Sequence, residues 1–205
     1  MYVALCTCRE GIPLQELIPS IKIERATGDD ALGLREVQRN TWLQTYANER
    51  SGITTDDIGW YFNTFKKSFS EGALQKTAAE LQEQKPNEAA FVAKDNGRII
   101  GFEWAMKYPT HNELGALYVL PSHQGQSVGF GLWNQARSFF DPTLPTRITV
   151  NKDNENAISF YERLGFKQTD KEIPSELTFP SGATFSEIEM IRPPEIRSNG
   201  SDGRK

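Results

Sequence analysis

The residues best suited to chemistry by type and spacing form a short glycine-bearing segment, Gln124-Gly125-Gln126-Ser127-Val128-Gly129. It follows an apolar segment, 113–120, and precedes a stretch whose apolar residues recur at helical spacing, 128–140. A helix that begins just after a strand offers free backbone N–H groups, and the positive end of its dipole, to an anion. Glycine lets the backbone approach phosphate oxygens closely. The segment is a candidate phosphate loop, although such glycines are also typical of a plain tight turn.

Two glutamates are candidates for proton transfer or substrate binding. Glu103 stands inside the apolar run 99–106, where a carboxylate costs free energy unless it is paired or used. It could act as a base, bind a cationic substrate, or face water on a one-sided sheet. Glu113 heads the next strand, and strand alternation would place it on one face with Leu117 and Val119. It could be a base or a solvated carboxylate at the strand end.

The hydrophobic pattern predicts one mixed α/β layer that positions these residues. Asn96-Gly97 favours a tight hairpin turn, Thr54 favours a helix N-cap, and Ile58, Phe62, Phe65 and Phe69 recur as one aromatic helical face, with these phenylalanines expected in the core. Strands are expected at 21–26, 91–94, 99–106, 113–120, 147–150, 166–168 and 183–191, and helices around 34–45, 54–69, 74–81, 128–140 and 156–164. The step from 113–120 through 128–140 to 147–150 should be a right-handed parallel crossover.

Composition narrows the class of protein. The 205 residues suit one domain with a hydrophobic core. A net charge of -4 argues against a nucleic-acid-binding surface, which needs clustered Lys and Arg. No apolar run has the length of a membrane span, and the N-terminus lacks the features of a signal peptide. Cys6 and Cys8 form no metal site with a nearby His and are expected as reduced thiols. We therefore expect a cytoplasmic protein with no nucleic-acid or membrane partner.

Residues 118–129 resemble motif A of the GCN5-related N-acetyltransferase (GNAT) family. That motif reads Gln/Arg-x-x-Gly-x-Gly/Ala after a strand that ends in a Val-x-Pro-like sequence. Gln124 and Gly129 match its first and last positions, and Ser127 replaces the middle glycine. The Cβ of Ser127 would crowd a pyrophosphate slightly, while its hydroxyl could donate a hydrogen bond in return.

Residues 151–166 resemble motif B of the same family, Asn-x-x-Ala-x-x-Phe-Tyr-x-x-x-Gly-Phe. The matching residues are Asn154 or Asn156, Ala157, Phe160, Tyr161, Gly165 and Phe166. The resemblance covers about residues 21–192. It implies the GNAT fold, a central twisted mixed sheet of six to seven strands flanked by about four helices. Residues 1–20 are then an N-terminal extension and 193–205 a disordered tail. Dimers are common in the family, so a homodimer is one expected assembly.

The resemblance also implies acetyl-CoA as co-substrate. Tyr161 matches the tyrosine that protonates the departing CoA sulfur, although it could simply pack. Glu113 has the same offset from Gln124 as the catalytic glutamate of the histone-type branch; Glu103 is its rival, and many members use a water chain instead. The residues expected to bind the cofactor are Leu117, Tyr118, Val119, Gln124, Gly125, Gln126, Ser127, Val128, Gly129, Phe130, Gly131, Asn151, Asn156 and Tyr161. Trp42, Tyr46 and Glu103 are expected to bind the acceptor.

The function predicted by this resemblance is transfer of an acetyl group to a primary amine by direct attack in a ternary complex. The expected acceptor is a small molecule such as a polyamine or an amino compound. Two alternatives remain open at this point. One is a protein N-terminal or lysine acetyltransferase. The other is a non-catalytic sensor module that binds acyl-CoA.

Overall fold

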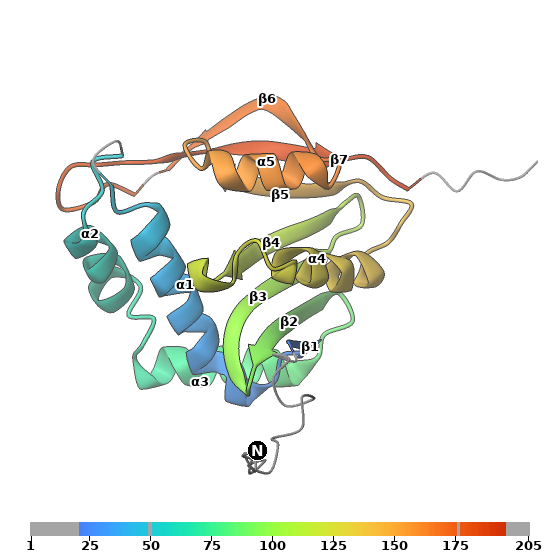
Figure 1. Cartoon of the computed structure of the whole chain (residues 1–205), viewed down its shortest axis with the longest axis horizontal. Helices are drawn as coiled ribbons and strands as arrows, with labels where there is room; N and C mark the ends of the chain where they lie inside the picture. The colour runs from blue at the N-terminus through green and yellow to red at the C-terminus, as the bar shows by residue number, and fades with distance from the viewer. Residues whose placement is uncertain (1–20, 49–50, 176, 196–205) are drawn as a thin grey trace, which may run out of the picture.

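One seven-stranded sheet organises the backbone, with strand order β1-β2-β3-β4-β5-β7-β6 (Figure 1). The computed structural model describes residues 21–48, 51–175 and 177–195. The strands are β1 Lys22–Arg25, β2 Glu88–Asp95, β3 Arg98–Lys107, β4 Asn112–Val119, β5 Thr146–Asn151, β6 Lys167–Pro174 and β7 Ser186–Arg192. Neighbours run antiparallel except β4 and β5, which are parallel. The mixed α/β sheet expected from the sequence is confirmed.

Five α-helices flank this sheet within the described residues, as the hydrophobic pattern predicted; the family resemblance implied about four. They are α1 Ala31–Thr45, α2 Thr55–Trp60, α3 Glu71–Glu83, α4 Val128–Phe139 and α5 Glu155–Arg163. Helix α4 packs over β2, β3 and β4, and α5 lies against the β5–β7 end of the sheet (Figure 1). In the view of Figure 1, α5 lies at the top, α1 and α2 lie at the left, and α3 runs along the bottom. In the described part of the chain, no helix combines the length and apolarity needed to cross a membrane.

Local sequence signals explain several element ends. Asn96 and Gly97 adopt left-handed φ values of 48° and 80°, as the predicted hairpin turn between β2 and β3 requires. The Thr54 hydroxyl accepts a hydrogen bond from the Asp57 N–H at 3.1 Å, and the Asp57 carboxylate accepts one from the Thr54 N–H at 2.9 Å. This reciprocal capping box starts α2, so the predicted cap is confirmed.

The predicted aromatic helix that runs on to Phe69 is wrong. Helix α2 ends at Trp60, and a π-helical turn, Tyr61–Phe65, follows it. A π-turn inserts an extra residue and rotates the side chains that follow off the original stripe. Phe62 consequently stays buried at 1 % exposure, whereas Phe65 is 50 % exposed. The expectation that Phe65 belongs to the core fails for the same reason.

The C-terminal prediction also needs a correction, whereas the predicted extension at 1–20 lies outside the described residues. The expected disordered tail was to start at residue 193, yet Glu195 is anchored. Its N–H donates to the carbonyl of Pro142 at 2.9 Å, and its carboxylate accepts hydrogen bonds from Arg137 and Arg192. The two arginines lower the pKa of the Glu195 carboxyl. The ordered chain therefore continues past β7 and fastens the end of α4.

Strands β4 and β5 pair only through the first two residues of each and then separate. The side chain of Asn112, 1 % exposed, holds the closed end of this opening. Its Nδ2 donates to the carbonyls of Asp141 at 2.8 Å and Leu144 at 3.3 Å, and its Oδ1 accepts from the Asp141 N–H at 3.0 Å. Asn112 thus fixes the connection that leads from α4 into β5.

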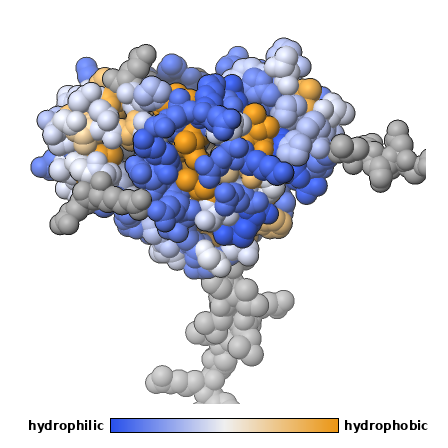
Figure 2. Space-filling view, turned by 90° about the horizontal axis from the view of Figure 1, so that it is seen from above, coloured by the Kyte–Doolittle hydropathy of each residue, from blue (hydrophilic) through white to orange (hydrophobic). Residues whose placement is uncertain are grey.

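The surface seen from above, over β6, β7 and α5, is largely hydrophilic, and hydrophobic residues are exposed there only in small patches bordered by hydrophilic ones (Figure 2). On this side the hydrophobic side chains of β5 and β7 instead point inward. Ile148, Val150 and Met190 are buried together with Trp133 and Phe166 beneath α4 and α5. This cluster holds β5, which borders the opening opposite β4, against α4 and α5.

Replacing Asn112 tests its role at the closed end. Asn112→Ala removes three hydrogen bonds and leaves buried backbone groups unpaired, so we expect the free energy of unfolding to fall by about 3 kcal/mol. Urea denaturation followed by circular dichroism measures it. Asn134→Ala, on the exposed face of α4, is the matched control and should change stability by less than about 0.5 kcal/mol. Equal effects of the two substitutions would contradict the role.

Candidate active site

A cavity of about 1140 Å³ occupies the opening between β4 and β5. It extends from the start of α4, past α5, to the C-terminal end of α1. Most residues predicted for the site line it, namely Trp42, Tyr46, Leu117, Tyr118, Val119, Gln124, Gly125, Ser127, Val128, Gly129, Phe130, Asn151, Asn156 and Tyr161. Four predicted residues do not line it: Glu103, Glu113, Gln126 and Gly131.

The candidate phosphate loop has a backbone shaped by two left-handed residues. Gly125 has φ +76°, and Ser127, the N-cap of α4, has φ +62°. Side chains tie the loop to its surroundings: the Gln124 amide donates to the carbonyl of Val119 and the Gln126 amide to that of Ser122, each at 3.0 Å. The family motif places glycine where Ser127 stands, and the left-handed φ supplies a physical reason for that preference.

Gly129, the other glycine of the segment, and Gly131, two residues further along α4, allow close packing. A Cβ on Gly129 would lie 3.3 Å from Cζ of Phe160, so glycine lets α4 lie close to α5. A Cβ on Gly131 would collide with the side chain of Ile23 in β1. Gly131 therefore brings α4 onto the sheet and does not face the cavity. The expectation that it contacts the cofactor is not supported by its position.

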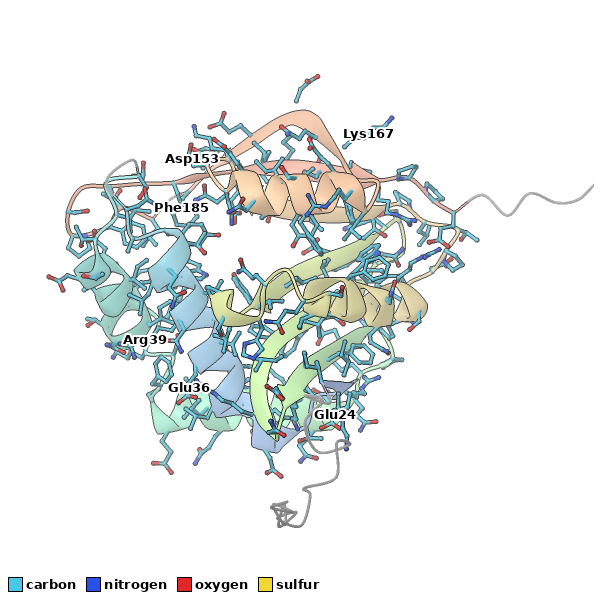
Figure 3. The ribbon with its side chains drawn as sticks, in the orientation of Figure 1. Glu24, Glu36, Arg39, Asp153, Lys167 and Phe185 are labelled. Atoms are coloured by element: carbon cyan, nitrogen blue, oxygen red, sulfur yellow. The ribbon has the colours of Figure 1, made fainter. Side chains whose placement is uncertain are left out.

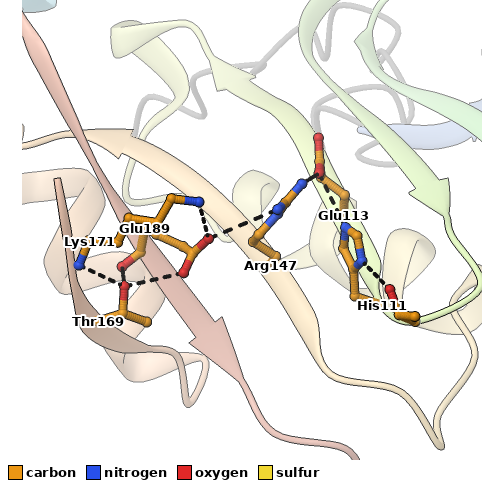
Figure 4. Close-up of polar contacts among 7 residues, drawn as sticks. His111, Glu113, Arg147, Thr169, Lys171 and Glu189 are labelled. Atoms are coloured by element: carbon orange, nitrogen blue, oxygen red, sulfur yellow. Dashed lines mark hydrogen bonds and ion pairs between the residues drawn. The ribbon is translucent and has the colours of Figure 1, made fainter. Parts of the chain in front are cut away.

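A bulge in β4 overturns the expected placement of Glu113. Trp104 of β3 pairs with Ala116 and Ala105 with Leu114, so Gly115 is an extra residue. The extra residue reverses the alternation: Leu114 and Leu117 both pack on the α4 side, and Glu113, next to Leu114, points to the opposite face. There its carboxylate accepts a hydrogen bond from Arg147, and Nε2 of His111 lies 3.6 Å away (Figure 4). Glu113 is a structural ion-pair partner outside the cavity.

Glu103 is sealed beneath α4 and not exposed to water. Its exposure is 0 %, and neither carboxylate oxygen has a hydrogen-bond partner among the described residues. Gly101 and Ala105 lie two positions away on the same face of β3. A Cβ on Gly101 would lie 3.2 Å from Leu132 of α4, and Ala105 packs in one cluster with Trp133 of α4. Burial raises the pKa of the Glu103 carboxyl well above its ordinary value. The expectation of direct contact with an acceptor is not met, because Glu103 does not reach the cavity.

Tyr161 lies in α5 and reaches the cavity from the α5 side of the opening. Its ring packs against Phe160 and Phe166, and the residue is 8 % exposed. Burial raises the pKa of the Tyr161 hydroxyl, and the nearby Tyr118, Tyr46 and Glu103 raise it further. The phenol therefore stays protonated at neutral pH. A protonated hydroxyl in a cavity wall can serve as a proton donor.

An aromatic box, which we define as Trp42, Tyr46, Tyr61, Tyr118 and Phe185, forms the far end of the cavity; Tyr61 does not line the cavity and stacks on Trp42. The indole of Trp42 stacks on Tyr61 at 4.8 Å between centroids and meets Tyr46 and Phe185 edge-on. Its Nε1 donates to the Tyr118 hydroxyl at 3.2 Å. Phe185 lies between the end of α1 and the start of α5 (Figure 3). The predicted pair Trp42 and Tyr46 thus belongs to one cluster drawn from four segments.

The sequence reading missed several cavity residues, of which Asn154, Phe185 and Glu187 are the clearest. Phe185 precedes β7, and Glu187 lies in it. Strand alternation shows that Glu187 and Glu189 share a face, but it cannot show that only Glu187 meets the cavity. The sequence of the segment that joins β6 to β7 shows no pattern that would have predicted that Phe185 lines the cavity.

Comparison with known proteins identifies the class. The model of the acetyltransferase (GNAT) family matches residues 59–166, and the chain belongs to this family. A mycothiol acetyltransferase of Mycobacterium leprae is 38 % identical over 178 residues, covering 76 % of this chain and 54 % of that protein. One of Streptomyces coelicolor is 40 % identical over 81 residues, covering 37 % of this chain and 26 % of the relative. The chain thus matches about half or less of these relatives.

Solved structures share the fold. The PaiA N-acetyltransferase from Thermoplasma acidophilum, a complex with coenzyme A, superposes with a TM-score of 0.64 at 23 % identity, covering 85 % of this chain and 99 % of that one. An acetyltransferase of the GNAT family from Streptococcus pneumoniae gives a TM-score of 0.61 at 16 % identity over 84 % and 99 %. At these identities the comparison concerns the fold alone.

The left-handed backbone at Ser127 predicts a stabilising substitution. Ser127→Gly removes a Cβ from a residue at φ +62°, so we expect the free energy of unfolding to rise by about 1 kcal/mol. Chemical denaturation measures this change, and calorimetry should find CoA bound at least as tightly. Ser138→Gly, in the last turn of α4, is the control and should destabilise by about 0.5 kcal/mol. A loss of stability in Ser127→Gly would show that the residue is not strained.

The buried carboxyl of Glu103 predicts a pH-dependent stability. The pKa of Glu103 is higher in the folded protein than the value near 4.5 of the unfolded chain. The protonated side chain is therefore fully tolerated below pH 4.5, and the folded protein loses stability as the pH rises from there toward the folded-state pKa. Glu103→Gln cannot ionise, so its stability relative to wild type should improve by roughly 1 kcal/mol per pH unit above pH 5. Denaturation at pH 5, 6 and 7 measures this difference. Glu36→Gln, exposed on α1, should show no such trend, and a flat difference for Glu103→Gln would contradict the assignment.

Proposed function

We propose that the protein is an acetyl-CoA-dependent N-acetyltransferase that acts on a small primary amine by direct attack in a ternary complex. The observation that carries this proposal is the continuity of the cavity, which joins the loop at the start of α4, the hydroxyl of Tyr161 and the aromatic box. A site for the donor, a proton donor and a site for the acceptor therefore adjoin one another. Membership of the acetyltransferase (GNAT) family supports the same reaction.

The donor would be held by backbone groups as much as by side chains. The N–H groups of the loop that includes Gly125 and Ser127, with the dipole of the 12-residue α4, suit a pyrophosphate. Between Leu117 and Val119, the side of β4 that faces β5 has no strand partner, so it can pair with the amide groups of a pantetheine arm. Asn156 lines the cavity beside this edge. The bound co-substrate would supply an acetyl thioester.

Tyr161 would act as the general acid in this reaction. Displacement of the thiolate requires a proton at sulfur. Tyr161 keeps its proton at neutral pH because burial raises its pKa, and proximity to a developing thiolate favours the transfer. It lines the cavity, and it lies near enough to Tyr118 and Tyr46 of the aromatic box for them to raise its pKa.

The enclosure of the box favours a small acceptor over a protein segment. The connection after β6 contributes Phe179 and Phe185, which pack with Trp42 and Ile58 in one buried cluster over this end of the cavity. A groove open enough for a polypeptide would require the members of this cluster to be separated. The relatives named mycothiol acetyltransferases agree with a small-molecule acceptor.

Turnover with acetyl-CoA and a panel of amines, followed by thiol release, tests the proposal. Tyr161→Phe should lower kcat about 100-fold, as expected for loss of a general acid, and leave the Kd for CoA within about threefold. Tyr108→Phe, a 40 % exposed tyrosine outside the cavity, is the matched control and should keep wild-type activity. Measurable CoA binding without thiol release for any amine would instead favour the non-catalytic sensor, and an unchanged kcat in Tyr161→Phe would remove the acid role.

A further inference from the structure

Glu187 is a cavity carboxylate that the reaction described above does not use. It lies in β7 directly opposite Asn151 of β5, and it lines the cavity. Paired residues of neighbouring strands point to the same side of a sheet, so Glu187 shares its face with Thr149, another cavity residue. The other face of β5 and β7 carries Ile148 and Met190, which pack beneath α4 and α5. Glu187 therefore approaches the opening from the side of α1.

The groups that surround Glu187 come from several elements. The hydroxyls of Tyr46, Tyr61 and Tyr118 all lie near enough for the charge of Glu187 to raise their pKa values. These tyrosines follow α1, lie in the π-turn and lie in β4, so the carboxylate faces the aromatic box. Burial raises the pKa of Glu187 itself, and hydrogen bonding to Thr149 lowers it.

The contrast with Glu189 shows what is unusual about this carboxylate. Glu189 stands two residues further along the same face of β7, and Nζ of Lys171 at 3.3 Å and Nη1 of Arg147 at 4.0 Å neutralise it (Figure 4). No lysine or arginine of the described chain is among the causes of the pKa shift of Glu187. A half-buried carboxylate among aromatic rings, with no cation beside it, is a site suited to a cationic ligand.

We propose that Glu187 is the acceptor-binding base of the proposed acetyltransferase reaction: it selects an alkylammonium group held against the rings of the aromatic box and takes its proton. This inference rests on the proposed function and names both the substrate class and a catalytic residue. A carboxylate attracts the ammonium ion, and aromatic faces stabilise it further. The remaining cavity carboxylates, Asp153 and Glu155, belong to exposed positions at the start of α5.

The proton balance of the step is complete. The ammonium nitrogen gives one proton to the Glu187 carboxylate and becomes nucleophilic. Its lone pair forms the C–N bond to the thioester carbonyl carbon, and the C–S bond breaks as Tyr161 gives its hydroxyl proton to the sulfur. The second proton leaves the nitrogen and returns to the Tyr161 oxygen, while Glu187 releases its proton to solvent. The products are an N-alkylacetamide, a thiol and one proton.

Two acceptors of similar size separate this role from a structural one: an alkylamine, which is protonated at neutral pH, and a hydrazide, whose nitrogen is already neutral. For Glu187→Gln we expect kcat/KM to fall at least about 100-fold with the alkylamine but no more than about threefold with the hydrazide. The variant should also regain rate with the alkylamine about tenfold per pH unit below the amine pKa of about 10.4, more steeply than wild type. Calorimetry with CoA checks that the donor site is intact.

Glu189→Gln is the matched control, on the same face of the same strand but outside the cavity, and should keep wild-type rates with both acceptors. Equal losses of Glu187→Gln with alkylamine and hydrazide would overturn the base role, as would an unchanged rate with both. If the wild-type protein releases no thiol with any acceptor, the proposed function itself fails. If wild type acetylates alkylamines and Glu187→Gln does so equally well, only the assignment of Glu187 fails.

Discussion

The early separation of β4 from β5 is the constraint on which the rest of the structure depends. Two paired residues at one end define where the strands part, and Asn112 holds that end through three hydrogen bonds to the connection before β5. Beyond it, backbone groups of β4 have no strand partner on one side, which is unfavourable in a covered position unless a ligand satisfies them. The close approach of α4 to α5, permitted by Gly129 against Phe160, forms one wall of the same opening.

The opening gives the two proposed substrates separate approaches. Leu117 and Val119 face α4, and the loop at its start lies on that side. Tyr118, between them in sequence, points the other way and accepts a hydrogen bond from Trp42 of α1. Glu187 and Thr149 share this second face. Tyr161, from α5, lies in the wall between the two approaches. A donor on one face and an acceptor on the other can meet only in the opening, which favours direct transfer without an acyl-enzyme.

Local signals in the sequence predicted what depends on local physics. The Asn96-Gly97 turn, the Thr54 cap and the glycine-bearing loop each follow from the conformational preference of one or two residues. The bulge at Gly115 could not be predicted, because it depends on how β3 and β4 align, and it reversed the placement of Glu113. The π-turn that exposes Phe65 escaped the helical period for a similar reason. Glu187 was missed because a strand pattern shows a face but not what lies opposite it.

Four glutamates of this sheet illustrate why residue type alone could not assign the base. Glu113 and Glu189 both lie beside Arg147, so their charges are balanced within the protein (Figure 4). Glu103 is buried under α4, where burial raises the pKa of its carboxyl; it lies near Tyr161 but does not itself line the cavity. Glu187 alone of the four combines contact with the cavity and a negative charge that no lysine or arginine of the described residues offsets. A cation supplied from outside would complete that site, and an alkylammonium acceptor is the cation that the proposed reaction brings.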